Sequence, residues 1–106
     1  MDEKIKTVLA ELRAELKKIY GERLKELILF GSQARGEADP ESDIDVAVIL
    51  AGEVNPLEEI DRTVALISDL CVEHGWLVSL IFLAEKEYQQ GGEPLIERLS
   101  RDGVSL

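Results

Sequence analysis

The sequence predicts a small α/β protein in which helices pack on one sheet. Apolar residues recur at helical spacing in three segments, 2–20, 56–74 and 94–101. Between them stand three apolar runs of strand length, 27–30, 43–50 and 76–83. The order helix, strand, strand, helix, strand, helix is typical of an α/β sandwich rather than of a bundle or a barrel.

The first helix is predicted by apolar residues three and four positions apart, followed by Gly21 as a C-terminal stop. The members of this stripe are Ile5, Val8, Leu9, Leu12, Leu16 and Ile19. The run 27–30 then has no polar residue and ends at Gly31, which favours a buried strand.

The second strand and the middle helix come next. Residues 43–50 alternate at first and then become wholly apolar. Asn55, Pro56 and Glu58 form a helix-start signal, with Asn as the N-cap and Pro at the first helical position. The buried stripe predicted for this helix consists of Leu57, Ile60, Val64, Ile67, Leu70 and Cys71.

The last third of the chain predicts one strand and one short helix. Residues 76–83 are apolar except for Ser79, and Gly75 precedes them as a helix stop. Residues 89–92 are typical of a loop. A final helix is expected over 94–101, around Leu95, Ile96 and Leu99.

Length and charge exclude several classes of function. The chain has 106 residues, and we expect one domain spanning 1–106. A formal charge of −10 opposes binding to DNA or RNA through phosphate contacts. No apolar run is long enough to span a membrane, and a lone Cys71 is suited to a reducing cytoplasm. We therefore expect a cytoplasmic protein with no membrane or nucleic-acid partner.

The negative charge is concentrated in the middle of the chain. Residues 27–62 contain nine acidic and two basic side chains, several of them between Glu37 and Asp45. Such a cluster is either a solvated acidic loop or a cation site, because neighbouring carboxylates repel one another unless a cation joins them.

Gly31 and Ser32 stand directly after the first strand. Gly31 permits a sharp turn, and the Ser32 hydroxyl with the N–H groups that follow it could bind a phosphate. The alternative is an ordinary strand-to-helix turn with Ser32 as its N-cap.

Asp43 and Asp45 lie two residues apart at the start of the second strand. Alternate residues of a strand share a face, with Cα atoms about 6.5–7 Å apart. Two carboxylates on one face could bind Mg²⁺, a cation that prefers oxygen ligands. The alternative is that both side chains face water at a frayed strand end.

The segment GSQARGEADPESDID, with Gly-Ser, ten residues and Asp-x-Asp, resembles the signature of the DNA polymerase β-like nucleotidyltransferase superfamily. The similarity is greatest to the minimal nucleotidyltransferase (MNT) proteins and covers nearly the whole chain. It implies the nucleotidyltransferase fold, an α/β (α+β) arrangement with a small mixed sheet and helices packed on it.

The resemblance also implies residue roles. Gly31 and Ser32 would hold the triphosphate of a nucleotide, most simply ATP, and Asp43 and Asp45 would be catalytic and hold two Mg²⁺ ions. Arg35 would offset phosphate charge, although pairing with Asp39 or Glu41 is an equally good expectation.

One position departs from the pattern of the family. Active members have a third carboxylate on the next strand, whereas Ser79 stands at that position here. A serine is a poor metal ligand and not a general base near neutral pH, so activity is in question. A serine bonded to the backbone is the structural alternative.

The resemblance implies a Mg²⁺-dependent transfer of AMP to a hydroxyl of a partner protein, with the chain acting as antitoxin to a HEPN-type toxin. Two alternatives are a binding module that neutralises its partner by complex formation and a regulatory nucleotide sensor. The sequence leaves open which nucleotide is used and whether the chain self-associates.

Overall fold

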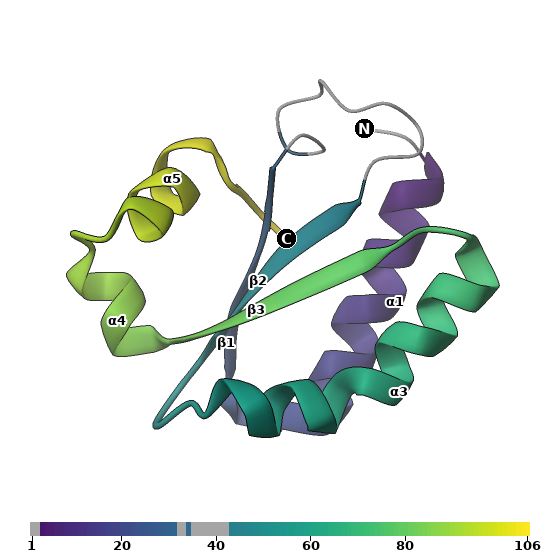
Figure 1. Cartoon of the computed structure of the whole chain (residues 1–106), viewed down its shortest axis with the longest axis horizontal. Helices are drawn as coiled ribbons and strands as arrows, with labels where there is room; N and C mark the ends of the chain where they lie inside the picture. Colours follow the sequence, from purple (N-terminus) through teal and green to yellow (C-terminus); the bar gives the residue numbers. More distant parts are fainter. Residues whose placement is uncertain (1–2, 32–33, 35–42) are drawn as a thin grey trace.

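The computed structural model describes residues 3–31, 34 and 43–106 (Figure 1). Its helices are α1 (Glu3–Tyr20), α3 (Pro56–His74), α4 (Glu85–Gln90) and α5 (Pro94–Asp102), with a 3₁₀ turn at Gly21–Arg23. Its strands are β1 (Leu24–Phe30), β2 (Ile44–Leu50), β3 (Val78–Ala84) and β4 (Val104–Ser105). All six predicted elements are present, and α4 and β4 are additions that the sequence pattern did not predict.

The four strands form one sheet in the order β3-β2-β1-β4. β1 is antiparallel to both of its neighbours, whereas β2 and β3 are parallel. Parallel neighbours need a long crossover, and α3 provides it. The mixed sheet with helices packed on it confirms the predicted α/β fold class.

Helices cover both faces of the sheet, with α1 and α3 on one face and α4 and α5 on the other (Figure 1). Alternate residues of each strand point to opposite faces. In β2, for example, Ile44, Val46 and Val48 join the core under α1, while Ala47 and Ile49 join the smaller core that contains Leu99 of α5.

The prediction for α1 holds except at its last turn. Ile5, Val8 and the leucines of the stripe are buried, but Ile19 is 36% exposed. Tyr20 is buried in its place, because it follows Leu16 by four positions and so continues the buried face.

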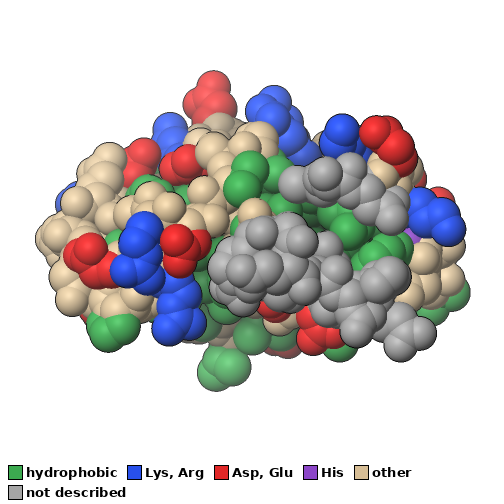
Figure 2. Space-filling model, turned by 90° about the horizontal axis from the view of Figure 1, so that it is seen from above, with side chains coloured by type: hydrophobic (Ala, Val, Ile, Leu, Met, Phe, Trp, Pro, Cys, Tyr) green, Lys and Arg blue, Asp and Glu red, His purple; other side chains and the backbone are tan. Residues whose placement is uncertain are grey.

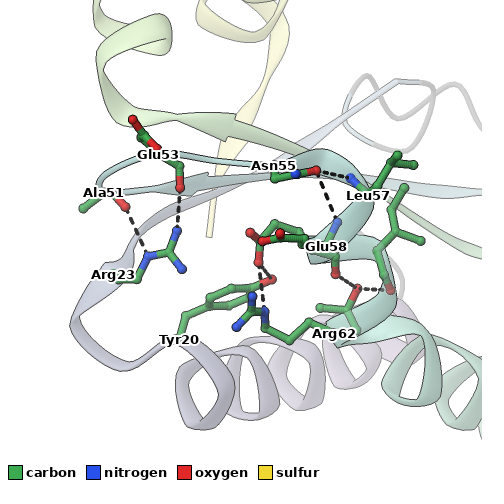
Figure 3. Close-up of polar contacts among 11 residues, drawn as sticks. Tyr20, Arg23, Ala51, Glu53, Asn55, Leu57, Glu58 and Arg62 are labelled. Carbon is green, nitrogen blue, oxygen red and sulfur yellow. Dashed lines mark hydrogen bonds and ion pairs between the residues drawn. The ribbon is translucent and has the colours of Figure 1, made fainter.

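The ends of α3 are confirmed, whereas the predicted buried stripe is wrong at three of its six residues, Leu57, Ile60 and Val64. Asn55 caps the helix by accepting from the N–H groups of Leu57 and Glu58 (Figure 3). Gly75 ends it with φ of 72°. The exposed fractions are 75% for Leu57, 49% for Ile60 and 55% for Val64. The fully buried residues of α3 are Glu59, Thr63 and Leu70.

A buried polar contact explains why Glu59 and Thr63, rather than Leu57, Ile60 and Val64, face the core. The Tyr20 hydroxyl donates to Oε1 of Glu59 at 3.0 Å, and Nε of Arg62 lies 3.1 Å from the same oxygen (Figure 3). The Thr63 hydroxyl donates to the Glu59 carbonyl at 2.9 Å. Because each of these buried polar groups has a partner, the face of α3 that contains Glu59 and Thr63 can be buried while the apolar stripe of the helix stays exposed.

Two strands differ from their predicted bounds. β1 begins at Leu24, three residues before the predicted start at 27. β3 begins at Val78 rather than at 76 and extends to Ala84.

Among the residues that the structure describes, no helix combines the length and apolarity needed to cross a bilayer.

Candidate functional site

Asp43 and Asp45 lie where the chain enters β2. Asp43 directly precedes the strand and is exposed, and Asp45 is half-buried. Ile44 between them is completely buried in the core under α1, and its N–H donates to the Leu77 carbonyl at 2.8 Å. Since this anchor points Ile44 to one face of the sheet, the two carboxylates share the opposite face.

Gly31 brings the end of β1 against this pair. β1 ends at Phe30, whose register partner is Asp45, and Gly31 follows with φ of 76°. A Cβ at Gly31 would lie only 2.7 Å from Oδ2 of Asp45. Glycine therefore serves here for its left-handed backbone and for its lack of a side chain, which leaves room for the carboxylate.

The environment of Asp45 favours its neutral form. Burial raises the pKa of the Asp45 carboxyl above its ordinary value of 3.8, and the negative charge of Asp43 raises it further. A bound cation would reverse both effects, because it compensates for lost hydration and for the repulsion between the carboxylates. The pair with its adjacent glycine thus fits a divalent metal by donor chemistry and by the space left free.

Ser79 lies directly beside Asp45. The two residues are register partners in the parallel β2–β3 pair, so their side chains share a face, and Ser79 is exposed. β3 itself contains no acidic residue. Ala84, after which Glu85 begins α4, is about 17 Å further along the strand. Glu73 contacts His74 on α3, which covers the face of the sheet opposite to Asp45.

The structure therefore brings together Gly31, Asp43 and Asp45 of the predicted site residues. Ser32 and Arg35 lie outside the described residues, as do Glu37, Asp39 and Glu41. Figure 2 shows the molecule from above, the side at which β1 ends and β2 begins in Figure 1, with acidic, basic and apolar side chains on the same face. The close approach of Gly31 to Asp45 was not predicted, because only the register of β1 and β2 reveals it.

Two other features lie apart from this pair. Glu11, Glu73 and His74 have potential ligand atoms within 4.8 Å of one another, and Nε2 of His74 is 3.0 Å from Oε2 of Glu11. These contacts join α1 to α3 and account for the cluster as a helix contact. A hollow of about 470 Å³ lies between the segments that follow β2 and β3, which is the other end of both strands from Asp45.

Fold and site together place the chain among proteins with the nucleotidyltransferase fold. The chain belongs to the nucleotidyltransferase domain family, whose model matches residues 9–100. Two proteins of Methanocaldococcus jannaschii, provisionally named protein adenylyltransferases, are each 35% identical to it. The matches extend over 74 and 75 residues, which are 70% and 71% of this chain and 74% and 69% of the two relatives.

Solved structures share the fold. The crystal structure of a nucleotidyltransferase of Sulfolobus solfataricus, provisionally so described, has a TM-score of 0.65 at 26% identity. It aligns with 96% of this chain and 80% of its own chain. A chain of a toxin–antitoxin complex with AMP-PNP has a TM-score of 0.66 at 21% identity, over 91% and 69% of the two chains.

Proposed function

We propose that this nucleotidyltransferase transfers AMP from ATP to a hydroxyl group of a partner protein and acts as the antitoxin of a HEPN-type toxin. The observation that carries the proposal is the carboxylate pair Asp43 and Asp45, of which Asp45 lies against Gly31. The names of the two archaeal relatives support a protein acceptor. The fold shared with a chain of a toxin–antitoxin complex is consistent with the proposed partner.

In this proposal Asp43 and Asp45 hold two Mg²⁺ ions, Gly31 and Ser32 position the triphosphate, and Arg35 offsets phosphate charge. Mg²⁺ held there would supply positive charge that offsets the charge of the triphosphate and of the pyrophosphate. The chain's own contribution is placement, because the buried Ile44 fixes the face on which both carboxylates stand.

The balanced reaction needs no oxidant or further substrate. The oxygen of the acceptor hydroxyl forms a bond to the α-phosphorus of ATP, and the bond from that phosphorus to the β-phosphate oxygen breaks. Pyrophosphate leaves, and the hydroxyl proton passes to water. The described part of β3 offers Ser79 rather than a carboxylate beside Asp45, so we assign no general base to this chain.

The test is incubation of the purified chain with Mg²⁺, ATP labelled at the α-phosphate and the product of the neighbouring gene. We expect label on that protein, and loss of the label when Asp43→Asn and Asp45→Asn are combined. Asp69→Asn, an exposed carboxylate of α3, is the matched control and should leave transfer unchanged. No transfer from any of the four nucleoside triphosphates would contradict the enzymatic function.

The second candidate function is a binding module that neutralises its partner by occupancy. Ser79 favours it, since a serine stands beside Asp45 where the family resemblance implies a third carboxylate. The double variant at Asp43 and Asp45 separates the two functions. If it still neutralises the partner as well as the wild type, complex formation rather than transfer is the mechanism.

A further inference from the structure

The apolar stripe of α3 remains uncovered in the folded chain. Leu57, Ile60 and Val64 follow one another at helical spacing and are all about half exposed or more. A helix normally buries such a stripe, and contiguous exposed apolar side chains mark interaction sites. These residues therefore form one side of a surface that the described chain leaves without a partner.

The other side of this surface is the outer edge of β3. A groove of about 200 Å³ separates α3 from β3, and Ile60, Val64 and Ile67 line it from the helix. Val78, Ser79 and Leu80 line it from the strand, and no lining residue is charged. We call the stripe, the groove and this strand edge the α3–β3 surface.

β3 has an edge that is open to a further strand. It pairs with β2 on one side, and no strand in the described part of the chain pairs with its other side. Its seven residues, VSLIFLA, include neither a charge nor a proline. Natural edge strands are usually protected by such residues, so this edge is suited to pairing with an extended segment.

Charge selects among the segments that could bind there. Asp61 is exposed and flanks the stripe, three positions before Val64. α3 contains five acidic residues against one arginine, and the whole chain has a net charge of −10. A second copy would bring the same acidic helix to the surface, whereas a basic segment would meet complementary charge.

The α3–β3 surface lies next to the candidate site, because Ser79 at the edge of β3 is the register partner of Asp45. A residue paired beside Ser79 would lie two strand spacings, or about 10 Å, from the Cα of Asp45. Its side chain would point to the same face as Asp45, because directly opposed residues of neighbouring strands share a face. A segment bound to β3 would thus present a side chain toward the carboxylate pair.

We propose that the α3–β3 surface binds an extended segment of the acceptor protein, one that alternates apolar and basic residues and pairs with β3. That this segment belongs to the acceptor rests on the proposed function. Its apolar residues rest on the groove and the open edge, and its basic residues rest on Asp43 and Asp45, toward whose face the alternate residues would point, and on the net charge of −10.

The test uses the full chain without nucleotide and a fluorescein-labelled peptide in which valine and lysine alternate. Fluorescence anisotropy should show binding at least about tenfold tighter than that of a peptide with glutamate in place of lysine. Val64→Arg should weaken binding of the lysine peptide by about tenfold or more. Val72→Arg, the same change at an 87% exposed position of α3 outside the groove, should have little effect.

A lysine peptide with N-methylated backbone amides provides a second readout, because it cannot donate hydrogen bonds to the edge of β3. We expect it to lose binding. Equal affinities for Val64→Arg and Val72→Arg, or undiminished binding of the methylated peptide, would overturn the proposal. So would a wild-type dimer in sedimentation equilibrium that Val64→Arg alone dissociates, since the occupant would then be a second copy.

The two proposals can fail separately. Peptide binding without any label transfer to the partner protein would contradict the proposed function and leave the docking surface standing. Label transfer that Val64→Arg leaves unchanged would contradict the docking surface alone.

Discussion

Gly31 meets two constraints, a positive φ and a close approach to Asp45, and comparing its substitution with that of a second glycine separates them. Any other residue would be strained at φ of 76°, and a Cβ would also displace the Asp45 carboxylate. We predict that Gly31→Ala lowers the free energy of unfolding by about 1–2 kcal/mol through backbone strain and, in addition, abolishes nucleotide transfer. Urea unfolding and the label-transfer assay measure the two effects.

Gly52→Ala is the matched control for Gly31→Ala. Gly52 has φ of 80°, but nothing lies within 4 Å of the position that a Cβ would take. It should therefore show the loss of stability and keep transfer. If both variants remain active, the contact between Gly31 and Asp45 has no role in function.

Asp45 makes the stability of the fold depend on pH. Because burial and Asp43 raise the pKa of Asp45 in the folded state, the folded chain holds this proton more tightly than the unfolded chain does. Its contribution to the free energy of unfolding is therefore lost as the pH rises from the ordinary pKa of 3.8 through the raised value. We predict that Asp45→Asn removes this decline, so that its Tm gains on the wild type as the pH rises.

Tm measurements from about pH 4 to pH 7 in metal-free buffer test this prediction. Asp69→Asn is again the control, because its exposed side chain should leave the wild-type slope unchanged. A decline that is equally steep in Asp45→Asn would show that other groups cause it.

Among the elements, α1 and α3 depend on one buried contact. Tyr20→Phe removes the hydroxyl that donates to the Glu59 carboxylate, and it leaves Glu59 with the Arg62 ion pair. We predict a loss of about 1–2 kcal/mol in the free energy of unfolding, because a buried carboxylate loses one of its partners. Urea unfolding with and without the substitution measures it.

Tyr88→Phe provides the comparison for Tyr20→Phe. Tyr88 is a half-buried residue of α4 that packs against the smaller core, and no hydrogen bond of its hydroxyl is among the described contacts. Its substitution should change stability by less than that at Tyr20. Equal effects would show that the hydroxyl of Tyr20 adds nothing beyond the packing of its ring.

The sequence was sufficient to predict those elements that depend on neighbouring residues. Helix caps and apolar runs are local, so Asn55, Gly75 and the three long strands could be predicted from neighbouring residues alone. The inward turn of α3 could not, because Glu59 is buried through Tyr20, which is 39 positions away. β4 has only two residues and is defined by its pairing with β1, which is also a long-range contact.

The candidate site could likewise be predicted only in part from the sequence. The spacing of Asp43 and Asp45 predicts that they share a face, and the buried Ile44 between them agrees with it. The approach of Gly31 to Asp45 depends on the β1–β2 register, and the position of Ser79 depends on the length of the α3 crossover. No local pattern encodes either of these.

At the scale of the whole molecule, the net charge of −10 opposes the compact state. We predict that NaCl raises the Tm by screening this repulsion, and that MgCl₂ at equal ionic strength raises it further by binding at the carboxylate pair. Differential scanning fluorimetry of the wild type and of the double variant Asp43→Asn, Asp45→Asn tests both effects. The variant should respond equally to both salts, and an unchanged excess for MgCl₂ would place the metal elsewhere.

The parallel register of β2 and β3 has an evolutionary consequence. It sets position 79 one strand spacing from Asp45 on the same face of the sheet, so a single substitution could add a carboxylate there with no change of backbone. Under the proposed function, an aspartate or glutamate at position 79 would complete the set of carboxylates that the family resemblance implies, and related chains could gain or lose it by one substitution.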